Sequence, residues 1–464
     1  MKNKIDLTTG NILRKLLIVA IPTLLTSVVQ MSYNLTDMYW VGRIDSLTIS
    51  GTNAIAAVGT AGYYMWFGFG LILLVKMGTS IKISQAAGRD DIGEVKRIGN
   101  NGIILMLALA FIYSLIGFFG ADVYMIPFKD KLDPQVIIDS TSYLKVISMF
   151  IISFFMVNLF NGVYDGLGKT INTFVITASG LILNIVLDPI FILEEIEIFG
   201  NIYNGLGMGV TGAAIATVIS QSFILLIYIV LYSTKFRPFR IRVVKYYDWN
   251  KIKEIAKIGL PIGIQSMVFT TIAIIIAIMV ASYGDNATAI QRLGSQIEAL
   301  AWMVASGFQV ALASFVGQNY GAGKMDRVKD GYIVALKLLI PYGIFINIIM
   351  FVFAKQLIGL FIEDAEAILI GKRYLEILSV SQLFMIIELG TAGAFNGLGK
   401  TRIPSAVGFF GNLTRIPLGI LLALPLGVYG IWWAVSISSI LKGIVLTVWF
   451  LLYLRKLKLF KTSS

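Results

Sequence analysis

Long apolar stretches recur along the whole chain, and they constrain its fold more than any other feature of the sequence. They alternate with short polar loops over 464 residues. A helix of about 20 apolar residues is long enough to cross the hydrocarbon core of a bilayer. Charged residues make up only 14% of the chain, whereas a soluble domain carries about 25%. We therefore predict an all-α membrane protein.

Twelve stretches are long and apolar enough to be transmembrane helices. We predict spans at 14–42, 51–82, 95–119, 136–163, 168–193, 208–233, 253–283, 288–317, 329–354, 366–396, 401–424 and 429–454. This count divides the chain into two pseudo-symmetric bundles of six helices. We place the first lobe at 1–233, a basic linker at 234–252 and the second lobe at 253–464.

The charges of the loops predict the orientation in the membrane. Basic loops fall on one side of the twelve-span count: the N-terminus, 89–97, 169, 235–253, 324–329, 400–402 and 455–461. The loops at 122–133, 194–197 and 363–366 are mixed or acidic and fall on the other side. Because Lys and Arg concentrate in cytoplasmic loops, both termini are expected in the cytoplasm and the chain in the cell inner membrane.

Several short motifs occur twice. The run Gly166-Leu-Gly-Lys-Thr170 recurs at 397–401, the run at 85–88 resembles that at 318–321, and Pro22 matches Pro261. Each half has an even number of spans, so the halves share one orientation and are related by an axis along the membrane normal. The cleft between them is the expected substrate site.

The Gly-Leu-Gly-Lys-Thr runs superficially resemble a phosphate-binding loop. The Walker pattern needs a further glycine, but Val163 and Ala394 occupy the corresponding positions. We instead predict tight turns between helices, in which glycine adopts backbone angles unfavourable for other residues.

Ionisable residues inside spans indicate function, because each costs about 2.5–3.5 kcal/mol at a helix centre. Asn184 and Asp188 are four residues apart and share a helix face, and Pro189 frees a backbone carbonyl nearby. Together with Asp37 they predict an oxygen-rich site for Na⁺ or a proton. The alternative interpretation is a helix-end residue near the outer interface for Asp37, and a helix break at the outer interface for Asp188. The complete set of expected cation-binding residues is Asp37, Asn158, Asn161, Asn184, Asp188 and Thr217, of which Asp37, Asn184, Asp188 and Thr217 are the expected Na⁺ ligands.

The second half does not repeat these acids, since Arg415 and Gly419 stand where Asn184 and Asp188 stand in the first. Its span charges are Glu298, Glu388 and Arg415. A Glu388–Arg415 ion pair is expected, and Glu298 is a candidate for a cationic substrate or a proton. The candidates for the substrate cleft are Tyr33, Tyr63, Met267, Glu298 and Glu388.

The composition also excludes several classes of activity. The chain has no Cys and no His, and no arrangement of residues typical of catalysis is present. We expect neither an enzyme nor a cofactor. The net charge of +12 is explained by the basic loops rather than by a nucleic-acid partner. The expected partners are the lipid bilayer and small amphipathic or cationic compounds, and we expect a monomer.

Taken together, these residues resemble the multidrug and toxic compound extrusion (MATE) family. The resemblance rests on the runs at 34–42, 54–59, 161–170, 184–189 and 316–323 and covers nearly the whole chain. It implies a cation-driven exporter whose two lobes open alternately to each side. It further implies that Asp37, Asn184, Asp188 and Thr217 match the first-lobe cation site of DinF-like members.

The expected function is an antiporter that exports drugs and other toxic compounds in exchange for H⁺ or Na⁺. A lipid-linked oligosaccharide flippase of related architecture is the alternative within transport. It would need several convergent Arg and Lys residues in the cleft to hold a pyrophosphate, whereas nearly all basic residues here lie in loops.

Overall fold

The computed structural model describes residues 5–44, 50–130, 132–198, 201–234 and 237–461, with the backbone alone for 457–461. Residues 235–236 of the predicted linker and the two chain ends lie outside this description. The first lobe contains α1 (Ile12–Val41), α2 (Gly51–Gly88), α3 (Ile92–Tyr124), η1 (Ile126–Phe128), α4 (Pro134–Gly166), α5 (Thr170–Ile192), β1 (Glu195–Ile198), β2 (Asn201–Asn204) and α6 (Gly209–Ser233). The second lobe contains α7 (Trp249–Ala281), α8 (Asp285–Gly321), α9 (Met325–Val352), α10 (Ala354–Gly359), α11 (Ala365–Gly397), α12 (Arg402–Leu413), α13 (Arg415–Leu426) and α14 (Val428–Lys461).

The twelve predicted spans are confirmed. The described residues contain 12 helical segments that are long and apolar enough to cross a membrane. The eleventh segment is not one helix: α12 ends at Leu413 and α13 begins at Arg415. Pro417 lies in the first turn of α13, where the missing N–H of proline costs no helical hydrogen bond.

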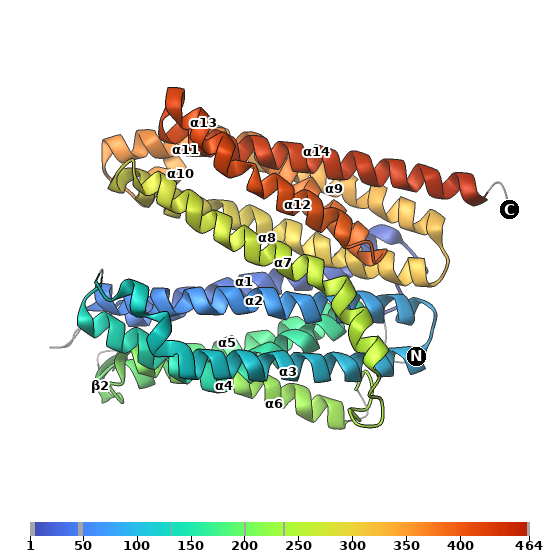
Figure 1. Ribbon diagram of the computed structural model, residues 1–464, viewed down its shortest axis with the longest axis horizontal. Helices are drawn as coiled ribbons and strands as arrows, with labels where there is room; N and C mark the ends of the chain where they lie inside the picture. The colour runs from blue at the N-terminus through green and yellow to red at the C-terminus, as the bar shows by residue number, and fades with distance from the viewer. Residues whose placement is uncertain (1–4, 45–49, 131, 199–200, 235–236, 462–464) are drawn as a thin grey trace.

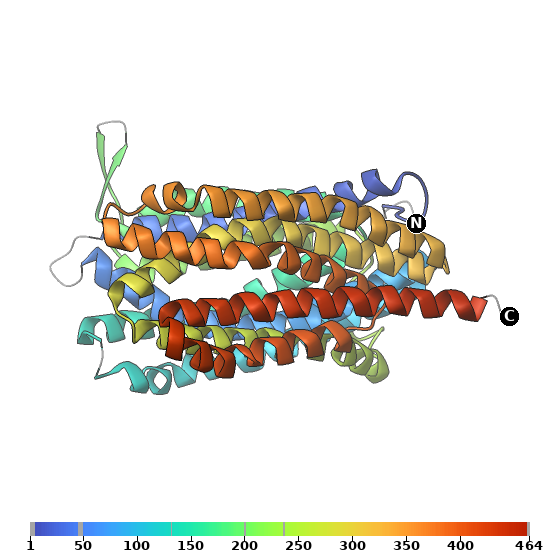
Figure 2. The same cartoon turned by 90° about the horizontal axis from the view of Figure 1, so that it is seen from above.

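One element departs from the all-α expectation. Strands β1 and β2 pair antiparallel, with Glu195 opposite Asn204 and Ile198 opposite Asn201. The alternation of Glu and Ile over 195–198 is the period of a strand rather than of a helix. This hairpin projects from the helical bundles in Figure 2.

The two lobes lie side by side with their helices roughly along one common direction (Figure 1). Both chain termini are at the same end of the molecule, which we call the terminal face; the β-hairpin is at the other end, the distal face (Figures 1 and 2). Helix α1 therefore starts at the terminal face, and α4 and α11 end there. Toward the distal face the helices of the two lobes diverge in Figure 1.

Helix α1 connects the cores of both lobes. In its first turns Leu16, Val19 and Ala20 belong to the apolar cluster that also contains Phe308 and Phe315 of the second lobe. Further along, its residues pack on α5. Pro22 lies inside this helix, where proline removes one backbone hydrogen bond.

Candidate functional site

Four of the predicted cation-binding residues meet in the distal half of the first lobe. The hydroxyl of Thr217 on α6 donates to Asp37 Oδ2 on α1 at 3.3 Å. On α5, Asn184 Nδ2 donates to Asp188 Oδ1 at 2.8 Å. The carboxyl groups of Asp37 and Asp188 are near enough to interact electrostatically. We call these four residues the acidic cluster.

Local sequence explains why α5 presents this face. Gly180, Asn184 and Asp188 are spaced by four residues, so they form one stripe along the helix. A Cβ at Gly180 would lie only 2.7 Å from the hydroxyl of Tyr33, so the missing side chain lets α1 approach at this level. Pro189 continues the helix but contributes no N–H.

The acidic cluster contains more acceptors than donors. Asp37 Oδ1, Asp188 Oδ2 and Asn184 Oδ1 are buried without a hydrogen-bond partner. Two carboxyl groups can hydrogen-bond to each other only if one carries a proton, and two adjacent buried carboxylates strongly disfavour double ionisation. The arrangement therefore suits a proton shared by the pair, or a small hard cation bound by oxygen ligands.

The possible cation ligands in the acidic cluster are carboxylate, amide and hydroxyl oxygens. Within the described ranges no group of three or more Asp or Glu side chains gathers. A cation here would therefore depend on Asn184 and Thr217 as well as on the acids. Such a set of hard oxygen ligands fits Na⁺ better than a transition metal.

Tyr33 and Tyr143 complete the surroundings of the acidic cluster. Both tyrosines interact electrostatically with Asp37 and Asp188. Tyr33 was predicted in the substrate cleft, but it is buried against Gly180 inside the first lobe. Its spacing of four residues from Asp37 places both on one face of α1, and this signal was available in the sequence.

The two acids differ in exposure. Asp188 is 0% exposed, whereas Asp37 is half-buried and lies one turn before the distal end of α1. Asp37 is thus the more exposed member of the pair.

The structure does not bring Asn158 and Asn161 into this cluster. Tyr143 is the α4 residue that interacts with the acids, and Asn158 lies fifteen residues, or about 22 Å, further along the helix. Asn158 Nδ2 donates to Phe154 O at 3.0 Å, and Asn161 Oδ1 accepts from Tyr228 Oη at 2.5 Å. Expecting them in the pocket was wrong because only their spacing, and not their depth, was considered.

In the second lobe, Glu298 is held by neutral side chains. It is 4% exposed and accepts from Tyr374 Oη at 2.7 Å and from Gln382 Nε2 at 3.2 Å. Arg415 also interacts with it electrostatically. Glu298 therefore lies inside the lobe, on the interface between α8 and α11.

The expected Glu388–Arg415 ion pair is corrected by the structure. Glu388 pairs with Lys442 of α14, at an N–O distance of 3.2 Å. The guanidinium of Arg415 instead donates to Ser438 at 2.8 Å and to Ser439 at 3.0 Å, and its interaction with Glu388 is longer-ranged. Sequence reasoning missed Lys442, although a single lysine within the last apolar span was a visible signal.

The remaining candidates for the substrate cleft are Met267 and Tyr63. Met267 of α7 packs against Gly70 of α2, where an added Cβ would lie 2.6 Å from its side chain. It therefore belongs to the contact between the lobes. Tyr63 of α2 is 49% exposed.

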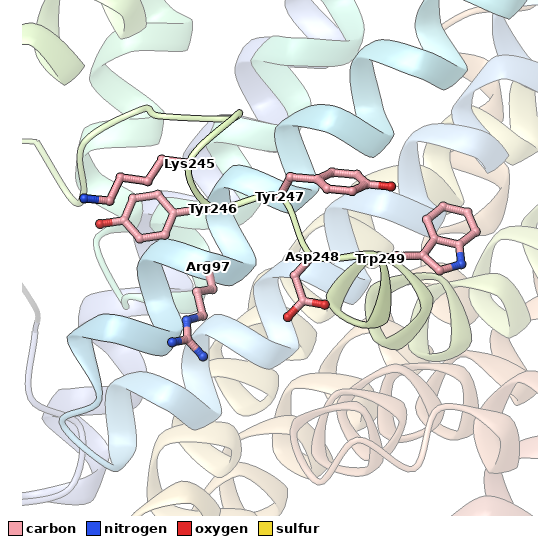
Figure 3. A pocket seen from close by; sticks show the side chains of 6 residues that line it. All are labelled: Arg97, Lys245, Tyr246, Tyr247, Asp248 and Trp249. Atoms are coloured by element: carbon pink, nitrogen blue, oxygen red, sulfur yellow. The ribbon is translucent and has the colours of Figure 1, made fainter.

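A separate hollow of about 550 Å³ lies at the terminal face, on the chain that links the lobes. Figure 3 shows its lining: Arg97, Lys245, Tyr246, Tyr247, Asp248 and Trp249. Asn101 of α3 fixes this linker, since its amide donates to Tyr246 O at 2.7 Å and accepts from Asp248 N at 2.9 Å. The hollow is remote from the acidic cluster.

The fold is that of known membrane transporters. A structure described as an outward-facing multidrug resistance MATE family transporter of the MOP superfamily superposes with a TM-score of 0.86, at 22% identity, covering 97% of this chain and 98% of the other. A MATE structure in complex with MaL6 gives a TM-score of 0.87 at 22% identity, with the same coverage. Two six-helix bundles of this topology define the fold of a multi-pass membrane protein.

The chain belongs to the MatE family, whose model matches residues 22–190 and 261–421. Its relatives include the probable multidrug resistance protein NorM of Thermotoga maritima, 28% identical over 94% of this chain and 92% of the relative. Another is the probable multidrug resistance protein YpnP of Bacillus subtilis, 27% identical over 94% of each chain. Members of this family are transporters rather than enzymes.

Proposed function

We propose that this chain is a secondary active antiporter that exports amphipathic, often cationic compounds in exchange for H⁺ or Na⁺. The proposal is supported by the family membership, by relatives named for multidrug resistance, and by the acidic cluster. The flippase alternative is not favoured, because the relatives are named for drugs and the buried cations Arg415 and Lys442 are engaged with side chains of their own lobe.

The observation that most supports this proposal is the pair Asp37–Asp188, which is surrounded by neutral groups. Among the described residues no cationic side chain is hydrogen-bonded or ion-paired to either acid. Removing a carboxylate from water without a partner costs several kcal/mol. The pair is therefore stable only with a bound proton or cation. Loss of that ion raises the free energy of the conformation in which both acids are buried.

Coupling would act through α1. Asp37 sits on its distal half, and Pro22 separates that half from the part packed into the second lobe. Binding a cation between Asp37 and Asp188 holds α1 against α5, whereas release favours a bend at Pro22. The two lobes then rock around the cleft between them. Asp37, the more exposed acid, would receive the cation from the distal side.

The driving force is sufficient for a concentrative exporter. One positive charge moving inward across 100 mV supplies about 2.3 kcal/mol. That free energy supports a concentration ratio of roughly fiftyfold. This estimate assumes that the terminal face is cytoplasmic, as the positions of the basic loops favour, that the membrane is the cell inner membrane, and that a single chain transports as a monomer.

The test is drug efflux from vesicles under separately imposed proton and sodium gradients. The wild-type chain should respond to one of the two gradients, and that response identifies the coupling ion. Asp37→Asn and Asp188→Asn should each reduce efflux to the level of protein-free vesicles while expression is unchanged. Asp139→Asn is the matched control, because Asp139 is hydrogen-bonded to Gln135 on its own helix. Full efflux in both cluster variants would refute the coupling site.

A further inference from the structure

The repeated glutamine and glycine motifs meet at the terminal face, where they join the two lobes. Gln85 of α2 donates through Nε2 to Gly397 O, at the end of α11, at 2.9 Å. Gln318 of α8 donates through Nε2 to Gly166 O, at the end of α4, at 3.4 Å. Each glutamine thus binds the first residue of the Gly-Leu-Gly-Lys-Thr turn of the opposite lobe.

The backbones of α2 and α8 cross closely because a glycine lies at the crossing point of each helix. A Cβ at Gly88 would lie 2.0 Å from Gln318 O, and a Cβ at Gly321 would lie 2.0 Å from Gln85 O. Any residue other than glycine would therefore force α2 and α8 apart. The contact is reciprocal, since each lobe supplies one glutamine and one glycine to the same crossing.

The two Gly-Leu-Gly-Lys-Thr turns are also hydrogen-bonded to α1 and α7. Gly168 and Gly399 have φ of 73° and 75°, which confirms the predicted tight turns. The hydroxyl of Thr170 donates to Val19 O on α1 at 3.0 Å, and that of Thr401 donates to Ile258 O on α7 at 2.7 Å. Movement of either turn is thereby linked to the helix that carries Pro22 or Pro261.

The N-terminal segment Ile5 to Gly10 covers this crossing and contacts both lobes. Ile5 N donates to Leu167 O of the first lobe at 3.3 Å. Leu7 N donates to Gln318 Oε1 at 3.1 Å, and Leu7 O accepts from Asn319 Nδ2 at 3.1 Å. The side chain of Leu7 is 0% exposed. The segment therefore seals one glutamine of the crossing from solvent.

We propose that Gln85 and Gln318, with Gly88 and Gly321, form a reciprocal clasp that holds the terminal face closed. In the closed state both amides and both turn carbonyls are hydrogen-bonded, whereas opening exposes them to water. The clasp thus sets the ratio of the two access states independently of the bound ion. The inference rests on the proposed function only because alternating access requires the terminal face to open.

The direct test is a distance measurement between spin labels on Ile92→Cys and Asp330→Cys, exposed positions on α3 and α9 at the terminal face. The chain has no other cysteine. Removing one net hydrogen bond shifts an equilibrium by about two- to tenfold. Gln85→Met with Gln318→Met removes the bonds to Gly397 O and Gly166 O and the bond from Leu7 N. It should raise the open-to-closed ratio by at least roughly five- to tenfold. Gln135→Met, whose amide bonds within its own helix, should leave the ratio unchanged.

A second pair of variants protects the test against misfolding of the glutamine double variant. Gly88→Ala and Gly321→Ala should each shift the distance distribution toward the open state. Gly62→Ala, on the same helix as Gly88 with nothing within 4 Å of the added Cβ, should not. Unchanged distances in folded glutamine and glycine variants would overturn the clasp, whatever transport they support. Absence of drug efflux in the wild type, with the expected distance shifts, would instead refute the proposed function alone.

Discussion

The buried ion pair of the second lobe allows a stability prediction whose magnitude depends on which partner is removed. Glu388 and Lys442 lie 3.2 Å apart with side chains 10% and 8% exposed. Arg415 interacts electrostatically with both of them, attracting Glu388 and repelling Lys442. The two partners of the pair are therefore not equivalent.

Breaking a buried pair by removing one partner costs about 3–5 kcal/mol. In Lys442→Met the remaining carboxylate of Glu388 keeps the nearby positive charge of Arg415, so we expect about 3 kcal/mol. In Glu388→Gln two cations remain with Glu298 as the nearest acid, so we expect about 5 kcal/mol. The double variant removes both charges and should lie within about 1 kcal/mol of the wild type, since an apolar replacement of an ion pair is often neutral.

The assay is the free energy of unfolding from equilibrium denaturant titration in detergent micelles. Lys145→Met serves as the control, because it breaks the Lys145–Asp122 pair, whose side chains are 37% and 70% exposed. An exposed pair contributes less than about 1 kcal/mol. Equal losses in Lys442→Met and Glu388→Gln would refute the role of Arg415. Additive losses in the double variant would refute the pairing itself.

Two further predictions concern the backbone. Asn101→Ala removes two of the bonds between α3 and the linker backbone and leaves the two made by Asn100, so tryptic cleavage within 237–248 should accelerate by up to about tenfold, and an unchanged rate would exclude this anchoring role. Gly284→Ala places a side chain at φ 103° with nothing within 4 Å, so unfolding should become easier by about 1–3 kcal/mol from strain alone. Gly62→Ala, equally uncrowded but helical, should be neutral or stabilising by up to about 1 kcal/mol, and a loss at Gly62 matching that at Gly284 would contradict the strain argument.

Features set by local chemistry were predictable from the sequence. The transmembrane helices follow from apolar length alone, because each span satisfies its own backbone hydrogen bonds. The tight turns follow from glycine at matching positions of the repeat. Asn184 and Asp188 meet because four residues are about one helical turn. Each of these inferences needs only neighbours along the chain.

Features set by packing between helices were not predictable in the same way. Asn161 has the polarity of a site residue, yet its partner is Tyr228 at a different depth of the lobe. Arg415 and Lys442 are both buried cations, and only the packing of α12, α13 and α14 decides which one reaches Glu388. Depth along a span was nevertheless available by counting residues from the helix end, and it would have separated Asn158 from the acids.

The contrast between the lobes explains why the proposal assigns coupling to the first. The scaffold is repeated closely: Thr170 and Thr401 bind equivalent carbonyls, and the clasp uses the same motif from each half. The interior is not repeated, since Arg415 replaces Asn184 and Gly419 replaces Asp188. In the second lobe Glu388 is paired with Lys442, and Arg415 interacts electrostatically with both Glu298 and Glu388. In the described part of the chain neither Asp37 nor Asp188 has such an ion-pair partner, whereas Asp165 of the same lobe lies 3.9 Å from Lys76. In the proposed mechanism, an ion from outside the protein balances these two acids, and this asymmetry between the lobes converts ion binding into movement of one lobe against the other.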